Sequence, residues 1–339
     1  MMHGSGSDLE RQAARLMARA GLSAPQRLEP LRGGRNNRVF AVHAPEGVFF
    51  LKAYFRHPGD PRDRLHAEFS FLEYAWARGL RTIPRPLARD DASGLGLYTF
   101  LEGRLLAPGE VTAAHVEAAA RFYVGLNPAD GPASGLPDGS EACFSLAAHL
   151  ECVAQRVGRL ADAATGPDFR PDAAAFVLDN LAPVWETWRD GTRDAAARLG
   201  LSMNAALPPA LRRVSPSDFG FHNALLGRDG DLFFVDFEYA GMDDPAKTVC
   251  DFFCQPDVPA SPAALPDFLR RVCGNSPDDA DLPARVELLL PVYRLKWCCI
   301  MLNEFLPVSA ARREFAEGGA RARRDRQLAL AKQTLLQLR

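Results

Sequence analysis

The chain has 339 residues, a formal net charge of −2 and 47% hydrophobic residues. That length can bury the cores of two lobes, and the near-neutral charge gives no basis for expecting a nucleic acid or an acidic membrane as a partner. Seven cysteines without a C-x-x-C pair favour core packing over metal or disulfide use. Neither a long uncharged apolar run nor a secretory signal pattern is present, so we expect a cytoplasmic protein without a transmembrane span.

The first elements are a helix and then a turn suited to phosphate. A capping-box pattern opens a helix at Ser7, and the helix ends at Gly21. Further on, a turn between two apolar runs contains Gly33, Gly34 and Asn37. Glycine lets backbone N–H groups approach a phosphate without a Cβ in the way, and asparagine is a good turn residue that can donate to one. We therefore expect this turn to meet a nucleotide.

A single lysine interrupts the apolar run 47–54, which predicts a strand. This residue, Lys52, is a candidate phosphate ligand and needs a carboxylate partner. A charged stretch over 61–78 predicts a helix that carries Glu68 and Glu73. Helical spacing from the neighbouring apolar residues favours Glu68 over Glu73 as the partner of Lys52.

The remaining chain is mainly helical apart from a few short strands. A strand at 97–103 would lead into a hinge, after which alanine-rich and amphipathic patterns dominate. Helices are expected over 111–126, 143–160, 172–199 and 288–305. Proline and glycine cluster between these helices and mark loops.

The segment from Ser215 to Glu238 concentrates oxygen ligands. Asp218 lies on a loop, Asn223 begins an apolar run five residues later, and Asp236 ends the next apolar run. The Gly-Arg-Asp-Gly-Asp turn between the runs predicts a hairpin, and antiparallel pairing would bring Asn223 and Asp236 to the same end of it. Such oxygens suit magnesium and the phosphates that it carries.

In this order the motifs resemble the aminoglycoside phosphotransferase and choline kinase family of protein-kinase-like enzymes. That family has a His-x-Asp-x-x-x-x-Asn loop followed by a strand that ends in Asp. Asp218, Asn223 and Asp236 match this pattern, whereas Pro216 stands in the His position. The Asp-Phe-Glu-Tyr-Ala-Gly segment at 236–241 is especially similar to choline and ethanolamine kinases.

The resemblance implies an α+β, bilobal protein-kinase-like fold with a small antiparallel-sheet N-lobe and a larger, mainly helical C-lobe. We expect residues 1–103 to form the N-lobe with its N-terminal helix and to bind the nucleotide. Residues 104–339 would form the C-lobe, with the catalytic loop, the metal site and the acceptor site. The resemblance also implies that Asp251 supports the catalytic loop structurally.

The activity implied by the resemblance is transfer of the γ-phosphate of ATP, with Mg²⁺, to a hydroxyl of a small molecule such as an amino alcohol, a sugar or an aminoglycoside. Asp218 would accept the proton of that hydroxyl. The other roles implied are nucleotide binding by Gly33, Gly34, Asn37, Lys52 and Glu68, and metal binding by Asn223 and Asp236. Candidate acceptor ligands are Glu238, Asp243, Lys296 and Glu304.

Each residue alone also allows a structural interpretation. Asp218 could cap a turn, Asp236 could cap a strand end, and Lys52 could lie on an edge strand with its ammonium in water. The ordered combination of five elements favours the phosphotransferase. The alternative function is a non-catalytic pseudokinase or nucleotide-binding module, which Pro216 supports. Protein-kinase activity is a third option, but no long insert resembling an activation loop follows Asp236.

Overall fold

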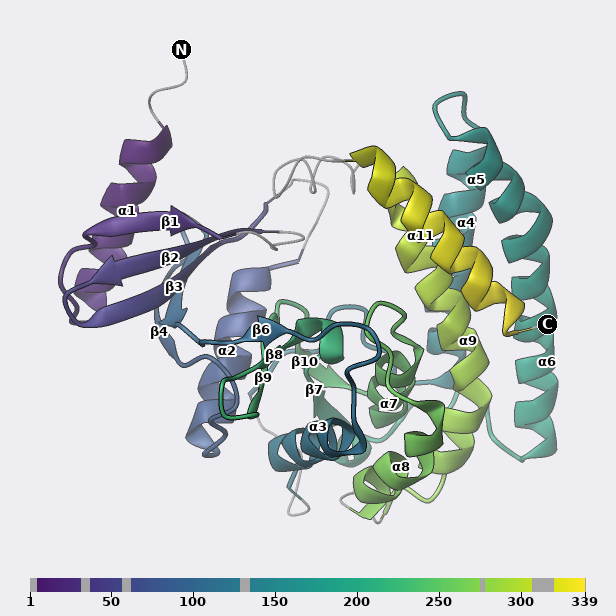
Figure 1. Cartoon of the computed structure of the whole chain (residues 1–339). Coiled ribbons are helices and arrows are strands. Elements are labelled where there is room, and N and C mark those ends of the chain that lie inside the picture. The colour runs from purple at the N-terminus through teal and green to yellow at the C-terminus, as the bar shows by residue number, and fades with distance from the viewer. Residues whose placement is uncertain are drawn as a thin grey trace. The chain divides into compact units, whose positions relative to one another are not determined.

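The computed structural model describes residues 5–31, 37–56, 62–128, 135–274, 278–306 and 320–338. Helices and antiparallel strands are combined in it, which confirms the α+β class (Figure 1). The described chain divides into two compact units. Among the described residues, the sheet unit comprises the chain up to Leu105 together with Ala224–Tyr239, and the helical unit comprises Leu106–Asn223, 240–306 and 320–338. A hairpin from the middle of the sequence is therefore added to the N-terminal segment.

The sheet unit is built on a five-stranded sheet whose order is β1-β2-β3-β5-β4 and whose neighbours are all antiparallel. The strands are β1 (Arg27–Pro30), β2 (Arg38–Ala44), β3 (Gly47–Ala53), β4 (Pro86–Asp90) and β5 (Leu95–Thr99). The strand predicted over 47–54 is thus confirmed as β3. A meander of this kind needs only short turns between its first three strands, because consecutive strands pair with each other.

The two faces of this sheet carry different chemistry. Helix α1 (Ser5–Arg19) places Met17 in an apolar cluster with Leu51 of β3 (Figure 1). Side chains alternate between the faces of a strand, so the next residue, Lys52, points to the other face. There it meets α2 (Arg64–Ala77), which is the helix predicted over 61–78. Alternation along β3 therefore separates an apolar core from a polar site.

The hairpin predicted after the loop that carries Asp218 is confirmed. Strands β8 (Ala224–Leu226) and β9 (Leu232–Phe234) pair antiparallel, and β6 (Arg104–Leu105) adds to the other edge of β8. The turn closes with a hydrogen bond of 2.8 Å from the backbone N–H of Gly227 to the carbonyl of Asp231. The predicted metal ligand Asp236 follows two residues after β9. The hairpin therefore determines where the backbone of Asp236 lies.

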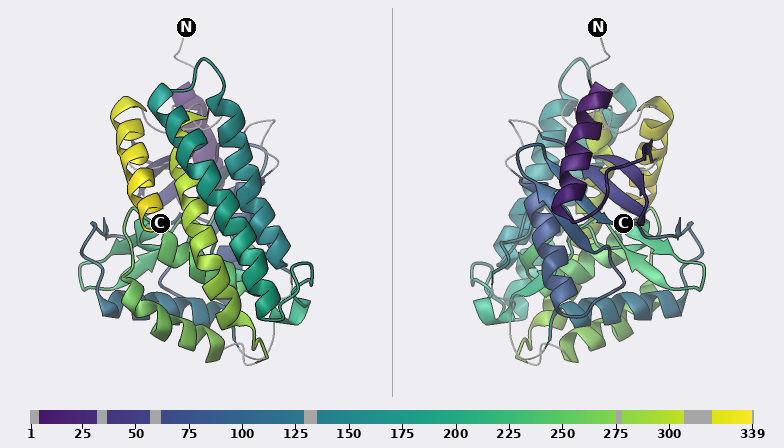
Figure 2. Two further views of the ribbon diagram at one scale, coloured as in Figure 1. Left: turned by 90° about the vertical axis from the view of Figure 1, so that its right-hand side faces the viewer. Right: turned by 90° about the vertical axis from the view of Figure 1, so that its left-hand side faces the viewer.

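Long helices form most of the second unit. They are α3 (Ala113–Leu126), α4 (Leu146–Ala164), α5 (Pro171–Phe176), α6 (Ala182–Arg198), α7 (Pro245–Cys254), α8 (Leu265–Gly274), α9 (Leu282–Leu302) and α11 (Ala320–Leu336). The helices predicted from sequence are confirmed within a few residues at their ends, with two differences. Helix α9 begins at Leu282, before the predicted 288, and a π-helical turn at Val177–Leu181 joins α5 to α6. Helix α9 packs along α4, α6, α7 and α11 (Figure 2). It is the central helix of the unit.

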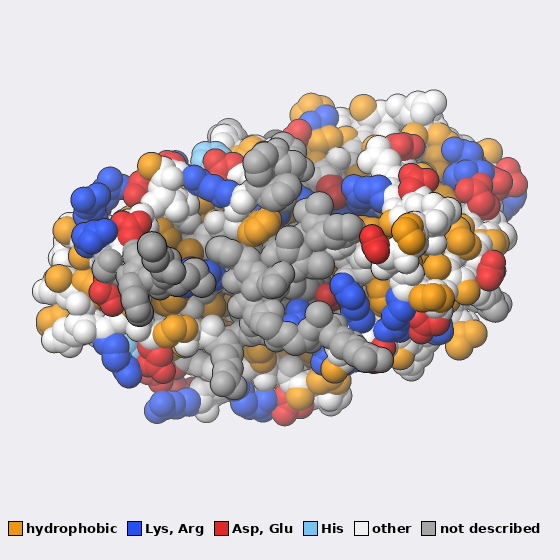
Figure 3. Space-filling view, turned by 90° about the horizontal axis from the view of Figure 1, so that it is seen from above, with side chains coloured by type: hydrophobic (Ala, Val, Ile, Leu, Met, Phe, Trp, Pro, Cys, Tyr) orange, Lys and Arg blue, Asp and Glu red, His pale blue; other side chains and the backbone are white. Residues whose placement is uncertain are grey.

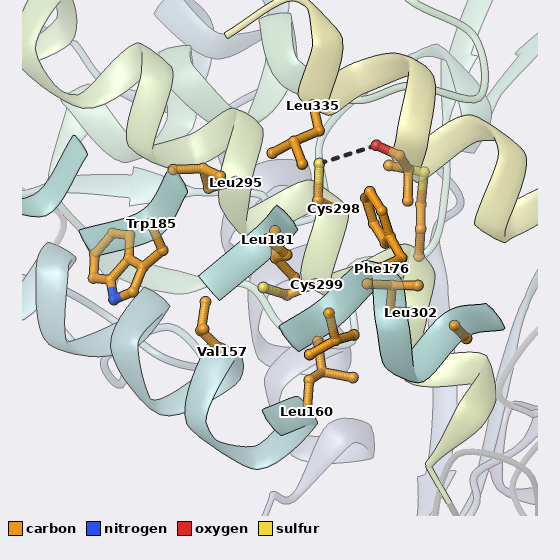
Figure 4. Close-up of a cluster of buried hydrophobic side chains, with 14 of the residues drawn as sticks. Val157, Leu160, Phe176, Leu181, Trp185, Leu295, Cys298, Cys299, Leu302 and Leu335 are labelled. Atoms are coloured by element: carbon orange, nitrogen blue, oxygen red, sulfur yellow. Dashed lines mark hydrogen bonds between the residues drawn. The ribbon is translucent and has the colours of Figure 1, made fainter. Parts of the chain in front are cut away.

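The core around α9 is apolar and includes cysteine. Trp185 of α6 and Leu335 of α11 are each about 2% exposed, while Cys298 and Cys299 of α9 are fully buried (Figure 4). The thiol of Cys298 donates to the carbonyl of Ala331 at 3.6 Å. Core packing was the role predicted for these cysteines, and the structure confirms it for this pair.

A two-stranded sheet lies before α7. Strand β7 (Arg213–Ser215) pairs antiparallel with β10 (Gly241–Asp243), and the segment 137–139 hydrogen-bonds to both backbone groups of Met242 at 2.8 and 2.9 Å. A Cβ on Gly241 would lie 2.5 Å from backbone atoms of that segment. Any side chain at position 241 would clash with this backbone, so the position requires glycine.

The surface of the described residues mixes both signs of charge. On the face drawn in Figure 3, acidic and basic side chains are interspersed among the described residues, as expected for a net charge of −2. Within the described ranges, no helix combines the length and apolarity needed to cross a bilayer.

Replacing Gly241 with alanine is expected to lower the free energy of unfolding by about 1–3 kcal/mol, because two backbone segments would have to move apart. Gly158→Ala in α4 is the matched control, since no heavy atom lies within 4 Å of its new Cβ. That control should raise the free energy of unfolding by about 0.5–1 kcal/mol. Urea denaturation of both variants measures the difference, and equal stabilities would contradict the close approach at Gly241.

Candidate active site

Lys52 is buried in the sheet unit between two carboxylates. Its Nζ lies 2.7 Å from Oε2 of Glu68 and 2.5 Å from Oδ1 of Asp236, and its side chain is 5% exposed. Burial by itself would lower the pKa of Lys52, but the charges of Asp236 and Glu68 outweigh it and raise this pKa well above the ordinary lysine value. The ion pair predicted between Lys52 and Glu68 is present, and the ammonium stays charged at neutral pH.

Glu68 accepts hydrogen bonds from other groups besides Lys52. The hydroxyl of Tyr54 donates to its Oε2 at 2.7 Å, and the backbone N–H of Phe237 donates to its Oε1 at 3.3 Å. The hydroxyls of Tyr54 and Tyr98 lie 2.7 Å apart. Burial and the charge of Glu68 raise the pKa of Tyr54, so that phenol remains a donor. Sequence reasoning missed Tyr54, although its position two residues after Lys52 places both on the same face of the chain.

Asp236 lies two residues after the end of β9 and adopts an unusual backbone conformation. Its φ is +67°, a region that non-glycine residues rarely occupy. Its side chain is 32% exposed, in contrast to the buried lysine that it contacts. A residue held in such a conformation costs about 1–3 kcal/mol and is typical of functional sites.

Glu238 and Asn37 are joined to each other. Nδ2 of Asn37 donates to Oε2 of Glu238 at 2.5 Å, and Oδ1 of Asn37 accepts from the backbone N–H of Phe55 at 3.0 Å. The guanidinium of Arg64 approaches Glu238 at 3.8 Å. Glu238 is 2% exposed and Asn37 is 3% exposed. The hydrogen bonds between them and to the backbone are therefore enough to explain why these two polar residues are buried. Predicted phosphate-turn residues Gly33 and Gly34 lie outside the described residues.

Asp218 lies in the helical unit on a strained loop. Its φ is +33°, and Ser217 before it has a φ of +46°. Asn223 donates from Nδ2 to the carbonyl of Asp218 at 3.0 Å and to its Oδ2 at 3.3 Å. Nε2 of His222 lies 3.2 Å from Oδ1 of Asp218. Both carboxylate oxygens of Asp218 thus face nitrogen groups from the same loop.

The base of this loop is tied to α7. The backbone N–H of Ser217 donates to Oγ of Ser215 at 3.1 Å, and the hydroxyl of Thr248 donates to the same oxygen at 2.8 Å. Ser215 and Thr248 are 2% and 3% exposed. The loop that carries Asp218 therefore begins at a residue, Ser215 of β7, whose position is fixed by these hydrogen bonds.

The predicted metal ligands have suitable chemistry. The amide of Asn223 uses its NH₂ group on Asp218, which leaves the amide oxygen as the atom that it can offer to a cation. Carboxylate and amide oxygens are hard ligands of the kind that magnesium takes. Asn223 belongs to the helical unit and Asp236 to the sheet unit. The described residues contain no group of three or more His, Cys, Asp or Glu side chains that could hold a metal.

Asp251 of α7 makes a buried ion pair with α9. Nζ of Lys296 donates to its two oxygens at 3.0 and 2.8 Å, and the indole N–H of Trp297 donates to Oδ1 at 3.1 Å. Lys296 was predicted as an acceptor ligand, but it is 5% exposed and paired with Asp251. We therefore assign Lys296 a structural role. Sequence reasoning missed Trp297 as the third member of this cluster.

Asp243 is also enclosed by protein groups. It is fully buried and accepts from the backbone N–H groups of Cys143 and Asp244 at 2.9 Å, and it pairs with Lys247 one helical turn along. These contacts favour a structural role over acceptor binding. Glu304, the last acceptor candidate, is 4% exposed, and its carbonyl accepts from Nε of Arg324 at 3.1 Å.

A sequence comparison decides the family. The profile of the phosphotransferase enzyme family (APH) matches residues 27–285. The chain belongs to this family. The prediction of a phosphotransferase enzyme is thereby confirmed, and so is the resemblance on which it rested.

Solved structures share the fold at low sequence identity. A choline kinase, LicA from Streptococcus pneumoniae, has a TM-score of 0.56 at 13% identity, with 92% of this chain and 94% of that chain covered. Spectinomycin phosphotransferase APH(9)-Ia has a TM-score of 0.62 at 12% identity, with 97% and 98% covered. Plasmodium vivax ethanolamine kinase has a TM-score of 0.56 at 11% identity, with 92% and 83% covered. In sequence alone, no curated protein is significantly similar to this chain.

Replacing Asp251 with alanine is expected to lower the free energy of unfolding by about 3–5 kcal/mol, because Lys296 would be left buried without its counter-ion. Urea denaturation measures the loss. The double variant Asp251→Leu, Lys296→Met should recover most of it, since it removes both charges.

Asp267→Ala is the matched control for Asp251, because its ion pair with Arg270 is about three-quarters exposed on both sides. Exposed pairs of this kind contribute about 0–1 kcal/mol. A loss at Asp251 no larger than at Asp267 would show that the buried cluster does not hold α7 to α9.

Proposed function

We propose that this phosphotransferase moves the γ-phosphate of ATP to a hydroxyl of a small molecule. The observation that carries the proposal is the position of Lys52, a buried ammonium fixed by Glu68 and by Asp236, the predicted metal ligand. A lysine held in this way presents a permanent charge at a defined point, as binding a nucleotide phosphate requires.

The printed descriptions of similar structures support a nucleotide substrate. The spectinomycin phosphotransferase structure contains ADP, and a LicA structure contains AMP. Those ligands belong to those proteins, and ATP is our proposal for this chain. The alternative, a nucleotide-binding module without catalysis, would keep Lys52 and Asp236 but would not need the strained loop at Asp218.

Phosphoryl transfer depends on positioning and on neutralising charge. In the proposed mechanism, Lys52 binds nucleotide phosphates and Glu68 keeps it aligned. Asn223 and Asp236 would hold magnesium, which supplies charge neutralisation at the phosphates when bound. Asp218 accepts a hydrogen bond from the acceptor hydroxyl, orients its oxygen for attack and takes its proton as transfer proceeds.

Two tryptophans can be excluded as ligands of a quaternary ammonium. A quaternary ammonium such as choline would need exposed aromatic faces around it. Trp185 belongs to the apolar core and is 2% exposed, and Trp297 is 5% exposed with its N–H bonded to Asp251. Neither is available for such a cage, whereas Tyr239 is only partly buried. The proposed acceptor class therefore remains an amino alcohol, a sugar or an aminoglycoside-like molecule.

Replacing Asp218 with asparagine is expected to leave ATP binding intact and to lower kcat by a factor on the order of 10² to 10⁴, because the general base is lost. The measurement is ADP formation with Mg-ATP over a panel of amino alcohols, sugars, nucleosides and aminoglycosides, with Asp218→Asn as the blank. Turnover by the wild-type chain no higher than this blank across the panel would overturn the proposed transfer and favour the nucleotide-binding module.

Replacing Asp236 with alanine is expected to abolish the extra thermal stabilisation that magnesium adds to ATP. Ligand binding raises stability by about 2.7 kcal/mol at a concentration of 100 Kd, so loss of the metal ligand should remove a measurable shift. The measurement is the difference in Tm between Mg-ATP and ATP with EDTA. Asp231→Ala, at an exposed position of the same hairpin, is the control and should keep the shift. An unchanged shift in Asp236→Ala would rule out its metal role.

A further inference from the structure

His222 has a defined contact that the roles assigned so far do not use. Its Nε2 lies 3.2 Å from Oδ1 of Asp218, and its side chain is 3% exposed. An ionised carboxylate can only accept hydrogen bonds, so Nε2 must carry the hydrogen and donate it to Asp218. The other ring nitrogen, Nδ1, has no hydrogen-bond partner among the residues that the structure describes. Asp218 is therefore the polar contact that orients this ring.

The imidazole is enclosed on its remaining sides. A Cβ on Gly220 would lie 2.9 Å from Nδ1 of His222 and 3.5 Å from Cγ of Gln255. Only a glycine leaves room for the ring at this point of the loop. The burial of His222 also argues against direct contact with a phosphate, because its exposed atoms are few and its Nε2 is already engaged.

The ring of His222 packs against Trp297, which is itself fixed by hydrogen bonding. The rings of His222 and Trp297 meet edge to face, with centroids 6.1 Å apart and an angle of 84°. Trp297 is itself fixed by its hydrogen bond to Asp251, and Asp251 by its ion pair with Lys296. Contacts thus run without a break from the buried ion pair between α7 and α9 to the carboxylate of Asp218.

We propose that His222 is a positioning residue for phosphoryl transfer, which donates Nε2–H to Asp218 and holds that carboxylate in the orientation that receives the acceptor proton. This inference rests on the proposed function of Asp218. Among the described residues, the loop position two before Asp218 is Pro216, which has no side-chain donor. The orienting donors are instead the two residues that end the loop, His222 and Asn223.

The hydrogen bond can be tested without any turnover. Long-range ¹H–¹⁵N NMR of histidine-labelled protein is expected to show His222 with its proton on Nε2, and Asp218→Ala is expected to shift that resonance and to speed exchange of the proton. A proton held on Nδ1 alone, or a spectrum that does not change in Asp218→Ala, would overturn the pairing. His222→Gln identifies the resonance by its disappearance.

Kinetics test the positioning role with an acceptor from the panel. His222→Leu keeps the bulk and removes the donor, so kcat should fall on the order of 10- to 100-fold while KM for ATP stays unchanged, as expected for misorientation of a reacting group. His222→Gln can place an N–H donor at similar reach and should recover most of the loss. His43→Gln, on β2 beside Glu29, is the matched control and should leave kcat unchanged.

A His222→Leu variant with wild-type kcat, or a Gln variant as slow as the Leu variant, would overturn the positioning role. Melting curves of both variants check that they fold, and the NMR result on the wild-type chain remains decisive if His222→Leu does not. Absence of turnover on every acceptor would contradict the proposed function, whereas the NMR result would still decide the pairing of His222 with Asp218.

Discussion

The sheet unit depends on the burial of one ammonium group. Lys52 is 5% exposed along its side chain, and a charge so far from water is tolerated only when opposite charges accompany it. Glu68 comes from α2 and Asp236 from the end of the hairpin, 16 and 184 residues away in sequence. Strand, helix and hairpin must therefore be in place together before the lysine is stable. A requirement for folding and a requirement for the proposed phosphate binding are met by the same contacts.

Helix α7, in the helical unit, also carries buried charges that are paired with opposite charges. Two of its charged residues are paired inside the protein. Lys247 pairs with Asp243, the last residue of β10, and Asp251 pairs with Lys296 on α9. Burial alone would lower the pKa of Lys247, but the charge of Asp243 reverses the effect and raises it above the ordinary lysine value. Since Thr248 of the same helix holds the base of the loop that carries Asp218, these ion pairs stabilise the position of the loop.

Local signals in the sequence predicted much of this arrangement. The spacing along one helix selected Glu68 over Glu73 as the partner of Lys52, and the Gly-Arg-Asp-Gly-Asp turn predicted the hairpin, because both depend on residues close in the chain. The partner of Glu238 was not predictable in this way. It is Asn37, 201 residues away, and nothing near either residue specifies the other. The burial of the acceptor candidates was also missed, since a carboxylate or an ammonium in a sequence does not show whether it faces solvent or a partner.

Asp218 and Asp236, the two aspartates with proposed roles in phosphoryl transfer, share one structural feature. Each has a positive φ, and each is followed directly by a buried phenylalanine, Phe219 at 3% and Phe237 at 2% exposure. Phe219 packs against an aromatic ring of α7 and Phe237 against one of α2, with centroids 5.1 and 4.5 Å apart. Burying a phenylalanine contributes about 1.5–3 kcal/mol, which matches the cost of about 1–3 kcal/mol for a strained backbone. Relaxing Asp218 or Asp236 to an ordinary conformation would pull its phenylalanine from the core. The carboxylates are therefore held in direction by apolar packing of the next residue, and they do not depend on a bound ligand for it.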